Sequence, residues 1–114
     1  MACVKLYILY TIYYIYYRGG NVNFIKKDKD TDGVSVLHNA AERGSVEMIS
    51  WLIKKKAQVA QRTSSLKRTP LMLACRGDHI PACMLLMKNG AMKTVNMQDS
   101  NGMTALHFAT IGKL

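Results

Sequence analysis

The chain has 114 residues, enough for one small domain, and 49% of them are hydrophobic, so a packed core is possible. Sixteen basic residues against seven acidic ones give a net charge of +9, which favours an acidic partner and does not bear on the fold. Three cysteines (Cys3, Cys75 and Cys83) are too few and too scattered for a disulfide framework, and they lack zinc-ligand spacing. We interpret them as buried free thiols in a reducing compartment.

An uncharged, tyrosine-rich run lies between Leu6 and Tyr17. At 12 residues it is shorter than the roughly 20 apolar residues that a membrane-spanning helix needs. No small-residue cleavage site follows it, only Arg18 and two glycines. We therefore predict a buried helix, with a membrane anchor or a secretory signal as the alternative.

The next segment predicts two short helices joined by a tight turn. Ser35 precedes an apolar stretch, and its hydroxyl group can cap a helix N-terminus. Small and apolar residues continue to Ala41, and Gly44 is expected to end this inner helix. A second, outer helix should start near Ser45, with apolar residues at helical spacing up to a basic end at residues 54–56.

The same pattern returns twice farther along the chain. Thr69 and Thr104 stand where Ser35 does, and Pro70 occupies a first helical position, where its missing amide hydrogen has no partner to lose. We expect Asp78 to cap the second helix of this unit. The chain thus contains at least two helix pairs and the start of another.

Three leucines at equivalent positions give the length of the sequence repeat. Leu37, Leu71 and Leu106 are separated by 34 and 35 residues. In a second register, Trp51-Leu52-Ile53 corresponds to Leu85-Leu86-Met87. A period of this length predicts stacked helical units that bury their apolar faces against one another.

The unit resembles the ankyrin repeat, which has about 33 residues and a Thr-Pro-Leu-His-x-Ala core. Thr69-Pro70-Leu71 is the best match, and Leu37-His38 and Leu106-His107 keep the following part. The resemblance implies an all-α ankyrin-repeat solenoid of stacked antiparallel helix pairs with short loop hairpins. It also implies a monomer or a part of a longer ankyrin protein.

The resemblance divides the chain into four segments. Residues 1–29 form an incomplete first repeat, or a hydrophobic N-terminal helix with a loop. Full repeats are expected at 30–63 and 64–98, and a truncated repeat at 99–114.

We find no residues at the spacing of a catalytic or metal-binding set. The resemblance gives His38 and His107 a structural role in bonding to neighbouring backbone, and it places His79 just before an outer helix. Cys75 occupies a small-residue position of an inner helix, which argues against a nucleophile. Cys-x-x-Cys, His-Glu-x-x-His and a phosphate-binding Gly-Lys-Ser/Thr are all missing from the sequence. We expect no enzyme activity, no cofactor and no metal ion.

The resemblance implies a non-catalytic protein–protein interaction module that acts as a scaffold or adaptor. The expected location is the cytoplasm, with the nucleus as an alternative. Ankyrin repeats bind through loop tips and the concave face of the inner helices. The matching positions are Thr31, Asp32, Val34, Glu42 and Arg43, then Ser65, Leu66, Arg68 and Arg76, then Ser100, Asn101 and Met103.

Charge suggests which protein partner fits this face. We expect Arg43 and Arg76 at equivalent positions along the concave side, with Arg68 projecting from a loop toward an acidic partner. The alternative is that the basic residues form only a solvated surface. Gly33 and Gly102 permit tight turns, but Lys67 replaces the turn glycine between them, so its loop should depart from the family geometry.

Nucleic acid and a membrane are two other classes of partner. Aromatic residues are not interleaved with the basic ones, so nucleic acid is not the expected partner. A membrane-associated ankyrin protein, anchored by residues 6–17, is the alternative function.

Overall fold

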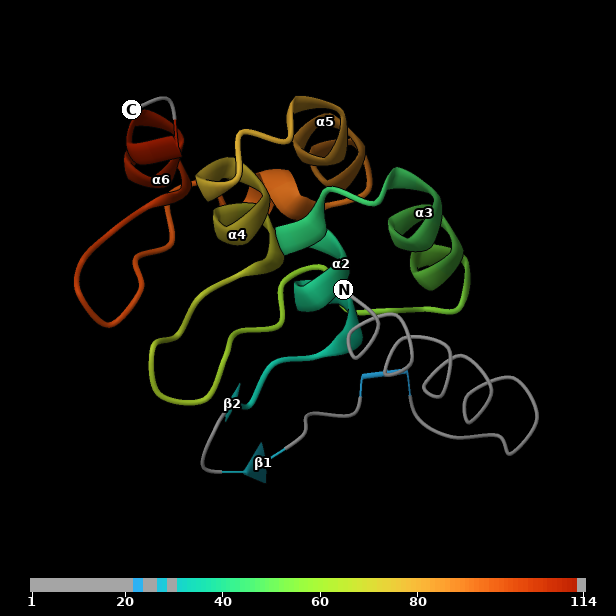
Figure 1. Ribbon diagram of the computed structural model, residues 1–114, viewed down its shortest axis with the longest axis horizontal. Coiled ribbons are helices and arrows are strands. Elements are labelled where there is room, and N and C mark those ends of the chain that lie inside the picture. The colour runs from blue at the N-terminus through green and yellow to red at the C-terminus, as the bar shows by residue number, and fades with distance from the viewer. Residues whose placement is uncertain (1–21, 24–26, 29–30, 113–114) are drawn as a thin grey trace.

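The computed structural model describes residues 22–23, 27–28 and 31–112, and for the two short strands it describes the backbone alone (Figure 1). The helix predicted for residues 6–17, and with it nearly all of the predicted segment 1–29, lies outside the described residues.

The elements follow the predicted order. Strands β1 (Lys27–Asp28) and β2 (Thr31–Asp32) form a short antiparallel hairpin in which Lys27 faces Asp32. Two helix pairs, a short 3-10 helix and a final α-helix follow in the described part of the chain. They are α2 (Val36–Arg43) with α3 (Val46–Lys54), α4 (Pro70–Arg76) with α5 (Ile80–Lys88), the short 3-10 helix η1 (Ala91–Thr94), and α6 (Ala105–Gly112).

The helices form two layers with the core between them. In Figure 1 the inner helices α2, α4 and α6 stand in a row, and the outer helices α3 and α5 lie on one side of that row. α4 packs against α2 on one side and against α6 on the other, while α3 packs against α5. Leu37 and Leu71 of the inner layer and Ile49, Leu52 and Leu86 of the outer layer are buried together. The predicted all-α fold of stacked helix pairs with a short loop hairpin is confirmed.

Each inner helix begins at the predicted hydroxyl cap. The Ser35 hydroxyl accepts a hydrogen bond from the amide of His38, and the Thr69 hydroxyl accepts one from the amide of Met72, both at 3.3 Å. The third side chain of each helix bonds back to the amide of the cap residue. This reciprocal arrangement satisfies two amide groups that a helix N-terminus otherwise leaves without partners.

Gly44 ends α2 as predicted, and Ser45 caps α3. Gly44 adopts a left-handed conformation, with φ at 72°, and its amide donates to the carbonyls of Ala40 and Ala41. Such a glycine lets the chain reverse immediately into the next helix. The two helices of the pair are therefore separated by only two residues.

Lys67 keeps the family turn, so the predicted departure of its loop is wrong. Its φ is 57°, close to 64° for Gly33 and 79° for Gly102 at the equivalent turns. A side chain in the left-handed region costs about 1–2 kcal/mol relative to glycine. The packing of the two finger-like loops around this turn, described below, holds Lys67 in place.

Asp78 does not cap α5, which corrects the prediction for that residue. The N-cap is His79, which makes no side-chain capping bond, and Asp78 itself is left-handed, with φ at 57°. Asp78 thus takes the place that Gly44 has in the preceding repeat. Aspartate is one of the few non-glycine residues that enters this region readily.

Candidate protein-binding surface

Two loops extend from the inner helices to one side of the molecule, where Figure 1 draws them in yellow-green and orange. We call residues 63–68 the second finger and residues 99–103 the third finger, because they precede the inner helices α4 and α6 of the second and third repeats. The base of the second finger is closed because the amide of Thr63 donates to the carbonyl of Arg68 at 2.9 Å, and the amide of Arg68 donates to the Thr63 hydroxyl at 3.0 Å. In the third finger, the amide of Asp99 donates to the carbonyl of Met103 at 2.8 Å.

Hydrogen bonds also join the two fingers. The amide of Ser100 donates to the carbonyl of Leu66 at 2.8 Å. The guanidinium group of Arg62 donates to the carbonyl of Lys67 in one finger and to the carbonyl of Gln98 just before the other. The fingers are therefore held side by side and form one continuous surface.

The predicted partner-binding residues differ in accessibility. Glu42, Arg43, Ser65, Ser100 and Asn101 are exposed, whereas Val34, Leu66, Arg68, Arg76 and Met103 are half-buried. The side chains of Thr31 and Asp32 lie outside the described part of the structure, which places their backbone in β2.

Arg76 does not align with Arg43, contrary to the prediction. Because Asp78 occupies the place of Gly44, the residue two positions before it, Arg76, corresponds to Glu42. The two side chains form an ion pair across the neighbouring inner helices, with 2.8 Å between Arg76 Nη2 and Glu42 Oε1. Arg76 therefore supplies less free positive charge to the surface than the sequence suggested.

Arg68 does not project toward solvent, which is a second correction. Its Nε lies 3.5 Å from Asp99 Oδ2, and its side chain is 21% exposed. The guanidinium carbon lies 5.2 Å from the centre of the Phe108 ring. Arg68 thus joins the second finger to the third repeat through an ion pair and a cation–π contact.

Asp99 organises the third finger, a role that the sequence analysis did not assign. Its Oδ1 accepts hydrogen bonds from the amides of Asn101 at 2.8 Å and Met103 at 2.9 Å. Burial raises the pKa of this carboxyl group, but the amides of Met103 and Asn101 and the guanidinium of Arg68 outweigh that effect and hold the pKa below the ordinary 3.8. The sequence Asp99-Ser100-Asn101-Gly102 carried the signal, since an aspartate often bonds to backbone two residues ahead in a turn.

Replacing Asp99 with asparagine should lower the free energy of unfolding by about 1–2 kcal/mol at pH 7, since bonds to a charged acceptor are lost. The lowered native pKa means that the carboxylate stabilises the fold above the unfolded value of about 3.9, and this contribution disappears as pH falls through the native pKa. Urea titrations should therefore give free energies of unfolding for wild type and Asp99→Asn that differ at pH 7 and converge once the pH falls below the native pKa of Asp99. A constant difference across this range would contradict the charge-based account; Glu42→Gln, at an exposed pair, serves as the control with a small effect.

His38 and His107 have the structural roles that the resemblance implied, and His79 stands just before the outer helix α5, as it also implied. His38 Nε2 donates to the carbonyl of Arg68 at 3.0 Å, and its Nδ1 accepts from the amide of Ser35 at 3.1 Å. His79 Nε2 donates to the carbonyl of Glu42 at 2.9 Å. Each of these two rings therefore bonds to the neighbouring repeat, whereas His107 bonds to Thr104 within its own repeat.

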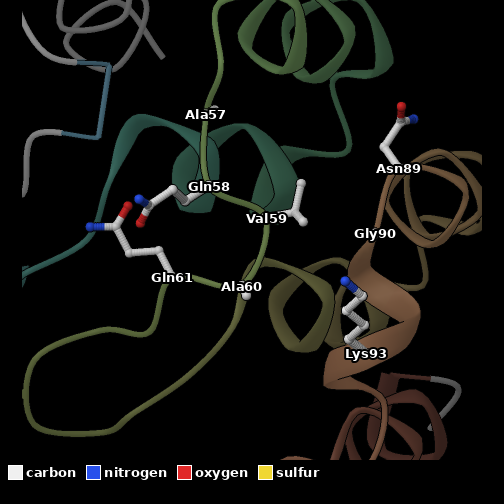
Figure 2. A pocket seen from close by; sticks show the side chains of 8 residues that line it. All are labelled: Ala57, Gln58, Val59, Ala60, Gln61, Asn89, Gly90 and Lys93. Carbon is white, nitrogen blue, oxygen red and sulfur yellow. The ribbon is translucent and has the colours of Figure 1, made fainter.

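A shallow cleft of about 480 Å³ lies apart from the predicted residues. Figure 2 shows the segment 57–61 on one side, and Asn89, Gly90 and Lys93 on the other. None of the predicted partner-binding positions lines it.

Within the described ranges, no group of three or more histidine, cysteine, aspartate or glutamate side chains is arranged to hold a metal ion. None of the helices there combines the length and the apolar character that crossing a bilayer requires.

Stacked helix pairs with finger loops tied by backbone hydrogen bonds define a helical repeat protein of the solenoid class. The sequence model of the family described as ankyrin repeats (3 copies) matches residues 1–97 and 55–113. The chain therefore belongs to the ankyrin-repeat family. Ankyrin repeats are non-catalytic modules that generally mediate protein–protein interactions.

Several curated proteins share this repeat region. Palmitoyltransferase ZDHHC13 of Homo sapiens is 35% identical over 83 residues, which are 73% of this chain and 13% of that protein. Alpha-latrotoxin-Lh1a of Latrodectus hasselti is 29% identical over 83 residues, 73% of this chain and 6% of the toxin. The chain thus spans a small part of the length of these relatives, and the match lies in ankyrin repeats.

Proposed function

We propose that this chain binds a protein partner through a surface formed by the tips of the second and third fingers and the C-terminal ends of α2 and α4. The observation that carries the proposal is the bonding between the fingers. The Ser100–Leu66 backbone bond and the two bonds from Arg62 fix the fingers before any partner arrives. A surface ordered in advance loses less conformational entropy on binding.

Exposed side chains on this surface suggest the chemistry of the partner. Lys67 at the second finger and Arg43 at the end of α2 are exposed cations. α2 has 8 residues, so it is about 12 Å long, and an extended segment of about four residues would span a comparable length. We propose a partner segment with acidic residues at both ends of such a span.

Charge alone would give weak binding, because exposed ion pairs contribute only about 0–1 kcal/mol each. Leu66 and Met103, both half-buried, offer apolar surface beside the charges. We propose that they contact an apolar side chain between the acidic residues of the partner, while the cations speed its approach.

A double charge reversal tests the proposal. Arg43→Glu with Lys67→Glu should reduce binding to aspartate- and glutamate-rich peptides of known sequence by at least about tenfold, the equivalent of two exposed pairs lost and two repulsions gained. Fluorescence anisotropy at low and physiological salt measures the effect, which should shrink as salt is added.

The matched control is Lys54→Glu with Lys88→Glu, which changes the net charge equally at the ends of the outer helices α3 and α5. It should leave peptide binding almost unchanged. Equal losses in both double variants would mean that only overall charge matters, and no loss in either would place the binding surface elsewhere.

A further inference from the structure

Two cysteines in the second repeat face each other across the helix pair. Cys75 Sγ of α4 and Cys83 Sγ of α5 lie 3.6 Å apart. Both thiols are free, as the sequence analysis expected, but both are half-buried rather than buried. Neither lies in the second or third finger, and Cys75 lies in the last turn of α4.

The repeat pattern makes this pair unusual. Cys75 stands where the first repeat has Ala41, and Cys83 stands where it has Ile49. Both of those residues are fully buried members of the core. In the second repeat, both core positions carry thiols instead, one from each helix of the pair, at a distance that allows a sulfur–sulfur contact.

We propose that Cys75 and Cys83 form a redox-active dithiol that exchanges with low-molecular-weight disulfides such as oxidised glutathione and closes to a disulfide between α4 and α5. A disulfide bond needs the two sulfurs at about 2.05 Å, so they must approach by about 1.5 Å. Rotation of two half-buried side chains, with a small shift of the helices, covers that distance.

The contact between the thiols favours the first step. The hydrogen bond from Cys75 lowers the pKa of Cys83, although burial and the charge of Asp78 act in the opposite direction. The same hydrogen bond, followed by burial, raises the pKa of Cys75. Cys83 is therefore the thiol that ionises first and acts as the nucleophile, since the thiolate is the attacking form.

The reaction balances as a thiol–disulfide exchange. The Cys83 thiolate attacks one sulfur of oxidised glutathione and forms a mixed disulfide, and one glutathione leaves as a thiolate that takes up the proton released by Cys83. Cys75 then loses its proton and attacks Cys83 Sγ, expelling the second glutathione, which takes up that proton. The protein loses two electrons and two protons, and one oxidised glutathione becomes two reduced ones.

The closed form would join the two helices across the turn that contains Asp78. That turn has a left-handed aspartate instead of the glycine of the first repeat. A covalent link between Cys75 and Cys83 would restrain the same helix pair that this turn connects.

Mass spectrometry of the folded full chain tests the proposal, in a Cys3→Ser background that removes the third thiol. After incubation with oxidised glutathione, the main product should weigh two hydrogen atoms less than the reduced chain, with a Cys75–Cys83 peptide link and no bound glutathione. The matched variants Cys75→Ala and Cys83→Ile introduce the residues of the first repeat. With oxidised glutathione, Cys75→Ala should stop at a single stable glutathione adduct, because its mixed disulfide has no second thiol to resolve it.

The rate of disulfide formation shows whether the fold holds the two thiols together or whether they react only because they are eight residues apart in the sequence. The mixed disulfide should resolve at least about tenfold faster in the folded chain than in concentrated urea, since folding holds the second thiol beside it. Stable adducts on both cysteines of the folded chain would overturn the proposal. Disulfides between two chains as the main product, or closure no faster than in urea, would overturn it as well.

Discussion

Alanine in place of Gly44 should lower the free energy of unfolding by about 2–3 kcal/mol. The left-handed backbone of Gly44, with φ at 72°, contributes about 1–2 kcal/mol of this loss. A methyl group there would also lie 2.4 Å from Cγ and Nδ1 of the His79 ring. The ring must move, which disrupts its 2.9 Å hydrogen bond to the carbonyl of Glu42 and costs about 1 kcal/mol more.

Gly102→Ala is the matched control for the backbone contribution. Its φ is 79°, yet an added methyl group would meet nothing within 4 Å. It should therefore lose only the backbone part, about 1–2 kcal/mol. Urea denaturation followed by circular dichroism measures both variants. Equal losses would show that the contact with His79 has no energetic weight. In a His79→Ser background, Gly44→Ala should cost only the backbone part, because the ring and its hydrogen bond to Glu42 are already absent.

His38→Ala should lower the free energy of unfolding by about 2–4 kcal/mol, because it leaves a cavity and breaks buried hydrogen bonds. His38 is 0% exposed and joins Ser35 in its own repeat to the carbonyl of Arg68 in the next one. Its Nε2 must carry the hydrogen, because a carbonyl oxygen can only accept, and Nδ1 then accepts from the Ser35 amide. The alanine variant leaves that buried amide without its acceptor.

His107→Ala provides the comparison at the equivalent position of the third repeat. The ring of His107 makes the same local bonds to Thr104, at 3.0 Å and 2.9 Å, but the residue is exposed. His107→Ala should lower the free energy of unfolding by less than about 1 kcal/mol, the contribution of a capping interaction. If both variants lost the same amount in thermal and urea unfolding, the link from His38 to the neighbouring repeat would contribute nothing.

The helix boundaries were predictable because their causes are local. A hydroxyl group at Ser35 or Thr69, a proline at the first helical position and a glycine at the end act within one turn of the chain. The sequence was less informative where one residue type serves two purposes. Asp78 fits both a helix cap and a left-handed turn, and its left-handed backbone aligns Arg76 with Glu42, one position before Arg43.

The charged residues of the surface depended on contacts between repeats, which no local pattern encodes. Arg68 and Asp99 are 31 residues apart, and their pairing follows from the way that the third finger packs beside the second. The sequence does not show this packing, and from the sequence alone Arg68 is therefore predicted to be an exposed cation. The exposed tips at Ser65, Ser100 and Asn101 were in contrast predictable, since the repeat period alone places them at the loop ends.

Some contacts between repeats use backbone atoms and would survive the exchange of one repeat for another, whereas others need particular side chains. His38 bonds to the carbonyl at position 68, and Ser100 bonds through its amide to the carbonyl at position 66, so any residue type there would supply the same atoms. The Arg76–Glu42 and Arg68–Asp99 pairs need particular side chains on both partners. If the 64–98 unit were deleted in frame, Met103 would present its carbonyl to His38, but Ile111 would face Glu42. Exchanging the repeats would thus preserve the hydrogen bonds to backbone carbonyls and lose the ion pairs. The fold therefore depends on the order of these repeats as well as on their number.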